Sequence, residues 1–146
     1  IEKINKLMPD ACIGVDVIVG FPGEDDDLFL ESMSFLEKLN VSYLHVFKYS
    51  ERDNTYAISL PDSVDDNVRA KRSKLLRLLS SRKKATFYER NIGSIQDVLF
   101  ESEEKDGFIE GFSSNYIRFR RPWDPNLIGT IVKSIFINID SKGFAI

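Results

Sequence analysis

Hydrophobic positions in the first part of the chain change between helical and strand-like spacing. Apolar residues recur at helical spacing over residues 1–8 and 24–39. Nearly continuous apolar runs, rich in β-branched and aromatic residues, occupy residues 13–21 and 42–49. This order predicts a βαβ unit with parallel strands. The first run is so apolar that we expect its strand to be buried on both faces.

A polar loop and a basic helix follow, and then the period changes. Residues 50–63 are rich in turn-forming residues, and residues 64–91 carry one apolar stripe within a long helix. After Gly93 the pattern alternates, which predicts five short antiparallel strands. These are residues 95–101, 107–112, 115–120, 128–140 and 143–146. We therefore expect an α/β domain over residues 1–91 and an all-β domain over residues 92–146, a small closed barrel of the oligonucleotide-binding type.

Composition limits the class of protein. The 146 residues are 42% hydrophobic, which is enough for a buried core. No apolar run reaches the ~18 residues of a membrane helix, so we expect a soluble protein that has no membrane partner. Because the sequence starts at Ile1 inside a helical pattern, we also expect it to be a piece of a longer protein.

Cysteine and histidine are too scarce for a metal centre built from this chain alone. Cys12 is the single cysteine and His45 the single histidine, so an internal disulfide and a thiolate-bound cluster are excluded. We expect Cys12 to be an inert, partly buried thiol. His45 has no carboxylate near it in sequence and is expected to be a hydrogen-bonded sheet residue. The sequence predicts no metal ligand and no catalytic residue here.

Charge is concentrated in the long helix. The formal net charge is −3, yet residues 65–90 hold nine Lys or Arg residues against three acids. Those cations are Arg69, Lys71, Arg72, Lys74, Arg77, Arg82, Lys83, Lys84 and Arg90. Their face is either solvated or a surface that follows phosphates, since it lacks the alternating signs that form ion pairs within a helix.

An acidic residue interrupts the first predicted strand. Asp16 stands among apolar residues before Pro22 and Gly23, and burying a carboxylate without partners costs several kcal/mol. Ligands of parallel sheets bind at the carboxyl ends of the strands, where Gly20 and Gly23 would let a ligand approach the backbone. The donors for Asp16 are either ribose hydroxyls of a nucleotide-like cofactor or groups of the protein.

Three segments together resemble the radical S-adenosylmethionine (SAM) methylthiotransferases. They are residues 14–24 (GVDVIVGFPGE), residues 45–57 (HVFKYSERDNTYA), and residues 107–118 with their central Asn115-Tyr116. The likeness is strongest to the branch that acts on threonylcarbamoyladenosine in tRNA. It implies the C-terminal portion of a radical-SAM (β/α) partial barrel over residues 1–91, followed by an RNA-binding TRAM domain over residues 92–146.

The resemblance also implies a cofactor site. Asp16 would hydrogen-bond the ribose of SAM, and Ile18 would pack on adenine. The cofactor-binding residues expected in this way are Asp16, Ile18, Gly20, Val46, Phe47, Tyr49, Ser50 and Arg52. The cysteines that hold the [4Fe–4S] clusters of the family are absent and would lie in upstream domains of the same polypeptide. Asn54 replaces a family glycine, and asparagine tolerates a positive φ.

The predicted β domain carries cations interleaved with aromatic residues. Tyr116, Arg118, Arg120 and Arg121 are the candidate RNA-binding residues, since bases stack on rings for ~1–3 kcal/mol each and arginines neutralise phosphates. Arg118 and Arg120 should share one face of a strand. The alternative is that the rings point into the barrel, as about half must.

The resulting hypothesis is a cytoplasmic enzyme that methylthiolates a modified adenosine in tRNA. This chain would supply part of the SAM pocket and the RNA-binding domain, and it would be inactive alone. Two alternatives stay open: a non-catalytic nucleic-acid-binding module, and a methylthiotransferase that acts on a ribosomal protein.

Overall fold

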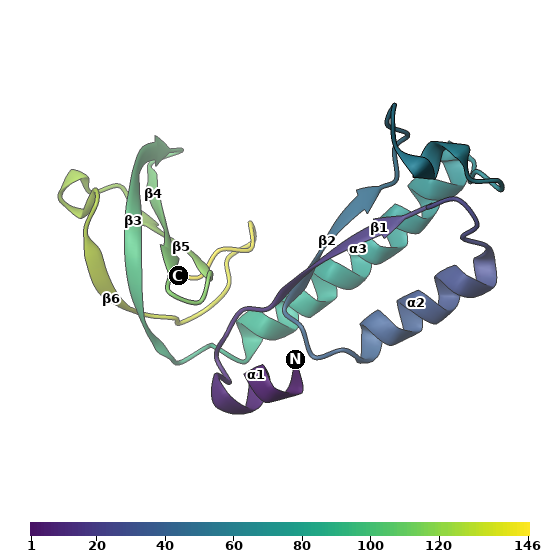
Figure 1. Ribbon diagram of the computed structural model, residues 1–146. Coiled ribbons are helices and arrows are strands. Elements are labelled where there is room, and N and C mark those ends of the chain that lie inside the picture. The colour runs from purple at the N-terminus through teal and green to yellow at the C-terminus, as the bar shows by residue number, and fades with distance from the viewer. The chain divides into compact units, whose positions relative to one another are not determined.

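The computed structural model describes residues 1–101 and 103–146. The chain forms two compact units, made of residues 1–3 with 13–84 and of residues 4–12 with 85–146. Each unit has its own buried apolar core. The structure is thus a mixed α/β unit and a small β unit (Figure 1). None of the described helices is long and apolar enough to cross a membrane.

The first unit contains the predicted βαβ arrangement. β1 (Gly14–Val19) pairs in parallel with β2 (Tyr43–Lys48), and α2 (Asp26–Lys38) connects them. α2 begins after Asp25, whose carboxylate accepts a hydrogen bond from the Leu28 N–H at 2.8 Å and so caps the helix. The short helix α1 (Glu2–Leu7) precedes β1. The prediction of parallel strands around a helix is confirmed.

Both long helices of the α/β unit cover the same face of the sheet (Figure 1). α3 (Asp66–Glu89) follows the 3₁₀ turn η1 (Tyr56–Ser59). The core consists of Val19, Phe29, Leu36, Val41, Leu44, Val46, Leu76 and Leu79. The prediction that β1 is buried on both faces is wrong, because its burial alternates and Asp16 and Ile18 are exposed on the face without helices.

The second unit is built on a four-stranded antiparallel sheet in the order β5-β4-β3-β6. The strands are β3 (Ile95–Lys105), β4 (Phe108–Ser113), β5 (Arg118–Pro122) and β6 (Ile131–Ile135). Between β5 and β6 lies the 3₁₀ turn η2 (Pro125–Leu127). The core consists of Phe87, Tyr88, Val98, Phe100, Ile109, Ile117, Phe119, Phe136 and Ala145.

The end of the chain joins β5 to the segment after β6. The Ala145 N–H donates to the Arg118 carbonyl at 2.9 Å, and the Ile146 N–H donates to the Asn138 carbonyl at 2.9 Å. The predicted strand over residues 143–146 is nevertheless reduced to isolated bridges at Ala145. Gly143 has a φ of 81° and belongs to the preceding turn, so the segment is too short for a ladder.

Two further strands start later than predicted. β5 begins at Arg118 because Tyr116 has a φ of 60° and belongs to a turn. β6 begins at Ile131 because Gly129 has a φ of 67°. Positive φ angles are incompatible with an extended strand.

Candidate functional site

The face of the β1–β2 sheet away from the helices is exposed and carries three of the predicted cofactor-binding residues, Asp16, Ile18 and Phe47. We call it the open face, and it consists of Gly14, Asp16, Ile18, Tyr43, His45 and Phe47. In the parallel register Asp16 lies beside His45 and Ile18 lies beside Phe47. The Asp16 side chain is 82% exposed, so its carboxylate is not the buried group that the sequence suggested. The open face combines a carboxylate with an apolar surface.

His45 also lies on the open face, and the sequence assigned it no catalytic role. Its Nδ1 atom lies 3.8 Å from a carboxylate oxygen of Asp16. His45 lies in a sheet, as predicted, and its carboxylate neighbour is distant in sequence because parallel pairing brings the two strands together. Aligning the starts of the two apolar runs would have revealed this pair.

Of the other candidate cofactor residues, one faces the core and four lie past the strands. The Val46 side chain is buried between the sheet and the helices, which leaves only its backbone for contact with a ligand. The remaining residues, in the turn after β1 and the loop after β2, are Gly20, Tyr49, Ser50 and Arg52.

The turn after β1 and the loop after β2 are bonded to each other. The Tyr49 N–H donates to the Val19 carbonyl at 2.8 Å, and the Gly23 N–H donates to the Asp62 carbonyl at 2.9 Å. Asn54 has a φ of 64°, as expected of a residue in place of glycine. The carboxyl ends of β1 and β2 thus meet at one edge of the sheet, next to the open face.

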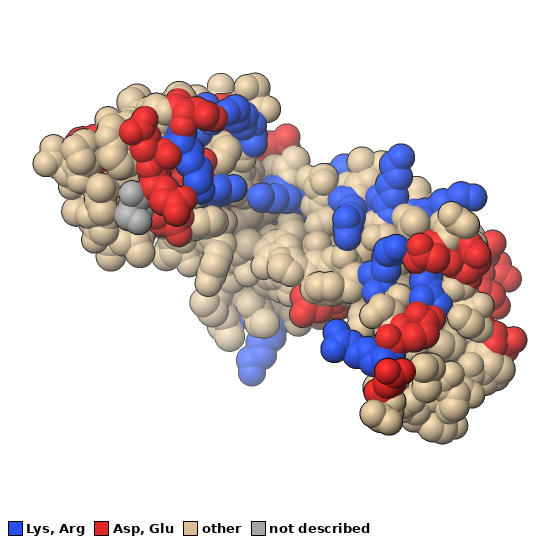
Figure 2. Space-filling view, turned by 90° about the horizontal axis from the view of Figure 1, so that it is seen from above, with Lys and Arg blue, Asp and Glu red and all other residues tan. Residues whose placement is uncertain are grey.

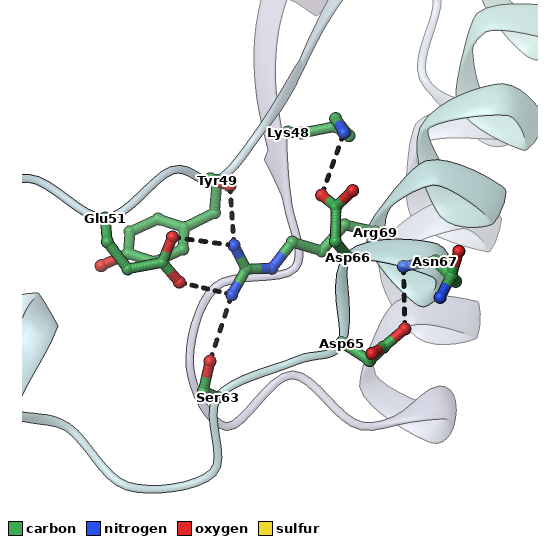
Figure 3. Close-up of polar contacts among 8 residues, drawn as sticks. All are labelled: Lys48, Tyr49, Glu51, Ser63, Asp65, Asp66, Asn67 and Arg69. Carbon is green, nitrogen blue, oxygen red and sulfur yellow. Dashed lines mark hydrogen bonds and ion pairs between the residues drawn. The ribbon is translucent and has the colours of Figure 1, made fainter.

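Arg69 of α3 holds the loop after β2 (Figure 3). Its guanidinium donates to the Tyr49 carbonyl at 3.1 Å, to both carboxylate oxygens of Glu51 at 2.6 and 3.1 Å, and to the Ser63 hydroxyl at 3.2 Å. The Arg69 side chain is 7% exposed. The hydrogen bond between the two side chains lowers the pKa of Glu51 from its ordinary 4.5 and raises the pKa of Arg69.

Arg72 holds the turn after β1 in the same way. Its guanidinium donates to the Glu24 carboxylate at 2.7 Å, the Glu24 carbonyl at 2.8 Å and the Asp26 carboxylate at 2.7 Å. Burial opposes the charge of Arg72, but its hydrogen bonds to Asp26 and Glu24 outweigh burial and raise its pKa. Arg69 and Arg72 are therefore not part of an exposed cationic face. The signal in the sequence was that they interrupt the apolar stripe of the helix.

In the β unit the predicted RNA-binding residues differ in accessibility. Tyr116 is 72% exposed. Arg118 forms an ion pair with Glu110 and keeps 40% of its side chain exposed. Arg120 is largely buried, with Nε 2.7 Å from the Asp140 carboxylate. Arg121 lies over the Phe100 ring, 5.8 Å from its centroid.

Arg118 and Arg120 lie on the same face of β5, as expected. Their guanidinium carbons are 4.7 and 5.2 Å from the centroid of the Phe144 ring. Phe119 between them points into the core. The pKa of Asp140 is lowered overall. Burial raises it, but this effect is outweighed by hydrogen bonds from the backbone N–H groups of Phe144, Lys142 and Gly143 and by the charge of Arg120.

An open groove of about 550 Å³ lies beside Tyr116. It is lined by Asp97, Leu99, Glu101, Phe112, Ser113, Ser114, Tyr116 and Ile131. Phe112 and Tyr116 pack edge to face, with ring centroids 6.4 Å apart. The groove therefore offers exposed rings, together with two carboxylates rather than cations.

Charged side chains of both signs lie next to one another in Figure 2, on both units. Among the described residues, no group of three or more His, Cys, Asp or Glu could hold a metal ion. Cys12 forms no disulfide and packs partly buried against the core of the β unit.

Known proteins resemble the chain over most of its length. A threonylcarbamoyladenosine tRNA methylthiotransferase MtaB of Bacillus subtilis is 36% identical over 138 residues, which cover 91% of this chain and 30% of the relative. Two proteins named tRNA-2-methylthio-N(6)-dimethylallyladenosine synthase are similar. That of Wolinella succinogenes is 39% identical over 76% of this chain and 26% of its own length. That of Bartonella bacilliformis is 36% identical over 99% of this chain and 31% of its own length.

No protein-family model matches the chain. The chain spans about 30% of the length of the curated relatives that it matches. These relatives are named as tRNA methylthiotransferases of two kinds, which differ in the nucleoside in their names. By sequence, the chain belongs to the tRNA methylthiotransferase family.

Proposed function

We propose that the whole protein is a radical-SAM enzyme that methylthiolates a modified adenosine of tRNA in the cytoplasm. Residues 1–91 would be the C-terminal part of its radical-SAM barrel, and residues 92–146 its TRAM domain. The observation that carries this proposal is the open face, where a carboxylate and apolar side chains lie beside the carboxyl ends of two parallel strands. Ligands of parallel sheets bind at such an edge.

The open face suits the parts of SAM. The exposed carboxylate of Asp16 can accept hydrogen bonds from both ribose hydroxyls, and such charge-assisted bonds are strong. Ile18 and Phe47 offer neighbouring apolar surface for adenine. Gly20, with a φ of 76°, follows β1 beside this face, and its missing side chain makes room for the stem of Arg69.

In this proposal, different parts of the whole protein bind SAM and the iron–sulfur clusters. When bound next to a reduced iron–sulfur cluster, SAM supplies the radical and the methyl group of this chemistry. By the family resemblance, the cluster ligands would come from upstream domains of the same polypeptide. In our proposal this chain binds and orients SAM and does not transfer electrons.

The β unit would hold the tRNA. Tyr116 offers an exposed ring for stacking, and Arg118, whose side chain is 40% exposed, would contact a phosphate. Arg120 and Arg121 would contribute through the structure of the barrel, since Arg120 is largely buried against Asp140. We propose threonylcarbamoyladenosine as the nucleoside from the motif resemblance, while the relatives carry names for that nucleoside and for dimethylallyladenosine.

Nucleoside analysis tests the reaction. The whole protein, with its clusters reconstituted, is incubated with SAM, a sulfur source and tRNA, and the digested nucleosides are examined by mass spectrometry. We expect a methylthio group on threonylcarbamoyladenosine. A product on dimethylallyladenosine would correct the substrate, a product only on ribosomal protein would replace tRNA, and no product on either would refute the enzyme function.

A further inference from the structure

Two arginines on one turn of α3 reach both segments that border the proposed cofactor pocket. Arg69 and Arg72 are spaced i, i+3, which places them on the same side of the helix. Their side chains are 7% and 6% exposed. Each guanidinium bonds to a different segment, Arg69 to the loop after β2 and Arg72 to the turn after β1.

Arg69 also contacts the end of β1. A Cβ atom added at Gly20 would lie 2.3 Å from Cγ of Arg69, so the aliphatic stem of the arginine passes directly over this glycine. The guanidinium lies 5.3 Å from the centroid of the Tyr49 ring. One side chain therefore touches the residue after β1 and the residue after β2.

Arg72 contacts Gly20 indirectly, through the carboxylate of Glu24. The Glu24 carboxylate accepts hydrogen bonds from the Arg72 guanidinium at 2.7 Å and from the Gly20 N–H at 3.1 Å. Removing the arginine would leave this mostly buried carboxylate with one strong donor fewer. Both arginines thus fix the backbone at Gly20, a residue of the proposed pocket.

We propose that Arg69 and Arg72 are positioning residues that set the geometry of the SAM pocket without touching SAM. This inference rests on the proposed function, in which the turn after β1 and the loop after β2 border the cofactor. Arginine suits the role because its planar fork satisfies several acceptors at once, whereas lysine presents a single ammonium group.

The test uses the whole, cluster-loaded protein with Arg69→Lys and Arg72→Lys. The matched control is Arg82→Lys on the same helix, where the arginine makes an exposed contact with Glu37 at 3.8 Å. Three quantities are measured: SAM affinity by calorimetry, amide hydrogen exchange of residues 20–26 and 49–63, and affinity for tRNA. We expect Arg69→Lys and Arg72→Lys each to weaken SAM binding roughly tenfold, which corresponds to the loss of one charge-assisted hydrogen bond. Amide exchange should become faster in residues 49–63 for Arg69→Lys and in residues 20–26 for Arg72→Lys. Affinity for tRNA, and all properties of Arg82→Lys, should stay within twofold of the unsubstituted protein.

The outcomes separate this inference from the function on which it rests. If the unsubstituted protein binds no SAM, the proposed function fails and the inference fails with it. If Asp16→Ala weakens SAM binding but both arginine variants bind as tightly as the unsubstituted protein, only the inference fails. If either arginine variant does not fold, Glu51→Gln, which leaves Arg69 in place, should still weaken SAM binding and loosen residues 49–63. Unchanged affinity in that variant would overturn the role of Arg69.

Discussion

Both the backbone conformation and the packing at position 20 require a glycine. Its φ of 76° is strained for other residues, and the stem of Arg69 occupies the space of any side chain. Gly23 has a φ of 87°, but no atom lies within 4 Å of an added Cβ. The two glycines therefore separate the cost of backbone strain from the cost of a steric clash.

We predict that Gly20→Ala destabilises the protein more than Gly23→Ala. The strained φ costs both variants about 1–2 kcal/mol, and the clash with Arg69 adds roughly 1–3 kcal/mol at Gly20. Chemical denaturation of both variants measures the difference. Equal losses of stability would show that Arg69 does not press on Gly20 in solution.

Arg118 and Arg120 should have different functions despite sharing one face of β5. We predict that Arg118→Gln reduces the salt dependence of RNA binding by about one unit of slope, because one phosphate contact is lost. Arg120→Gln should leave that slope unchanged and destabilise the protein by roughly 1–3 kcal/mol, since it removes the cation beside Asp140. Titration of tRNA at several salt concentrations, together with thermal unfolding, distinguishes the two. A reduced slope in Arg120→Gln alone would reverse these assignments.

The sequence indicated which residues belong to the candidate site, but it did not indicate whether their side chains are buried or exposed. The motif around Asp16 singled out this acid for a ligand, yet the apolar sequence on either side suggested that it is buried. Burial depends on which face the two helices cover, and that is decided by long-range packing. His45 was missed as its partner for the same reason, because only the parallel register brings the two together.

At the scale of elements, α2 shows how local sequence fixes the start of a helix. Asp25 caps the helix through the Leu28 N–H, whereas Asp27, two residues further along, lies within the first helical turn. We predict that Asp25→Ala lowers the free energy of unfolding by about 1 kcal/mol. Asp27→Ala, which loses only a favourable charge near the helix N-terminus, should cost about 0.3–1 kcal/mol at low salt and less at high salt. A loss at Asp25 that salt abolishes would indicate that charge, rather than the hydrogen bond, stabilises the helix.

The loop after β2 should loosen in acid. The pKa of Glu51 is lowered from 4.5 by its hydrogen bond with Arg69, so this contribution to stability is complete above the unfolded pKa and is lost as pH falls through the lower folded pKa. We predict that protection of residues 49–63 from amide exchange, corrected for intrinsic rates, decreases as pH falls below about 4.5. Glu51→Gln should show weaker protection at neutral pH and a smaller further loss in acid. Identical pH profiles for both proteins would contradict the role of Glu51.

Elements with a strong period were predictable, whereas short irregular ones were not. The βαβ unit follows from two apolar runs and one helical stripe. The boundaries of β5 and β6 do not, since they depend on positive φ angles at Tyr116 and Gly129. Tyrosine rarely adopts a positive φ, so the presence of Tyr116 did not indicate a turn at this position.

At the scale of the whole molecule, charge pairing is mostly non-local. Arg69 and Arg72 were grouped with the other cations of α3 because few acids stand near them in sequence. Their partners, Glu51 and Glu24, lie in segments that reach them only after the βαβ unit folds. Two of the nine cations in this sequence segment are therefore buried ion-pair partners, and they do not contribute to the charged surface seen in Figure 2.

A structure of the whole protein bound to SAM, with its clusters loaded, tests the central claim most directly. We predict that the ribose hydroxyls lie within hydrogen-bond distance of Asp16 and that adenine contacts Ile18 or Phe47 on the open face. SAM bound elsewhere, with the open face covered by other parts of the protein, would contradict the assignment of this sheet to the cofactor pocket.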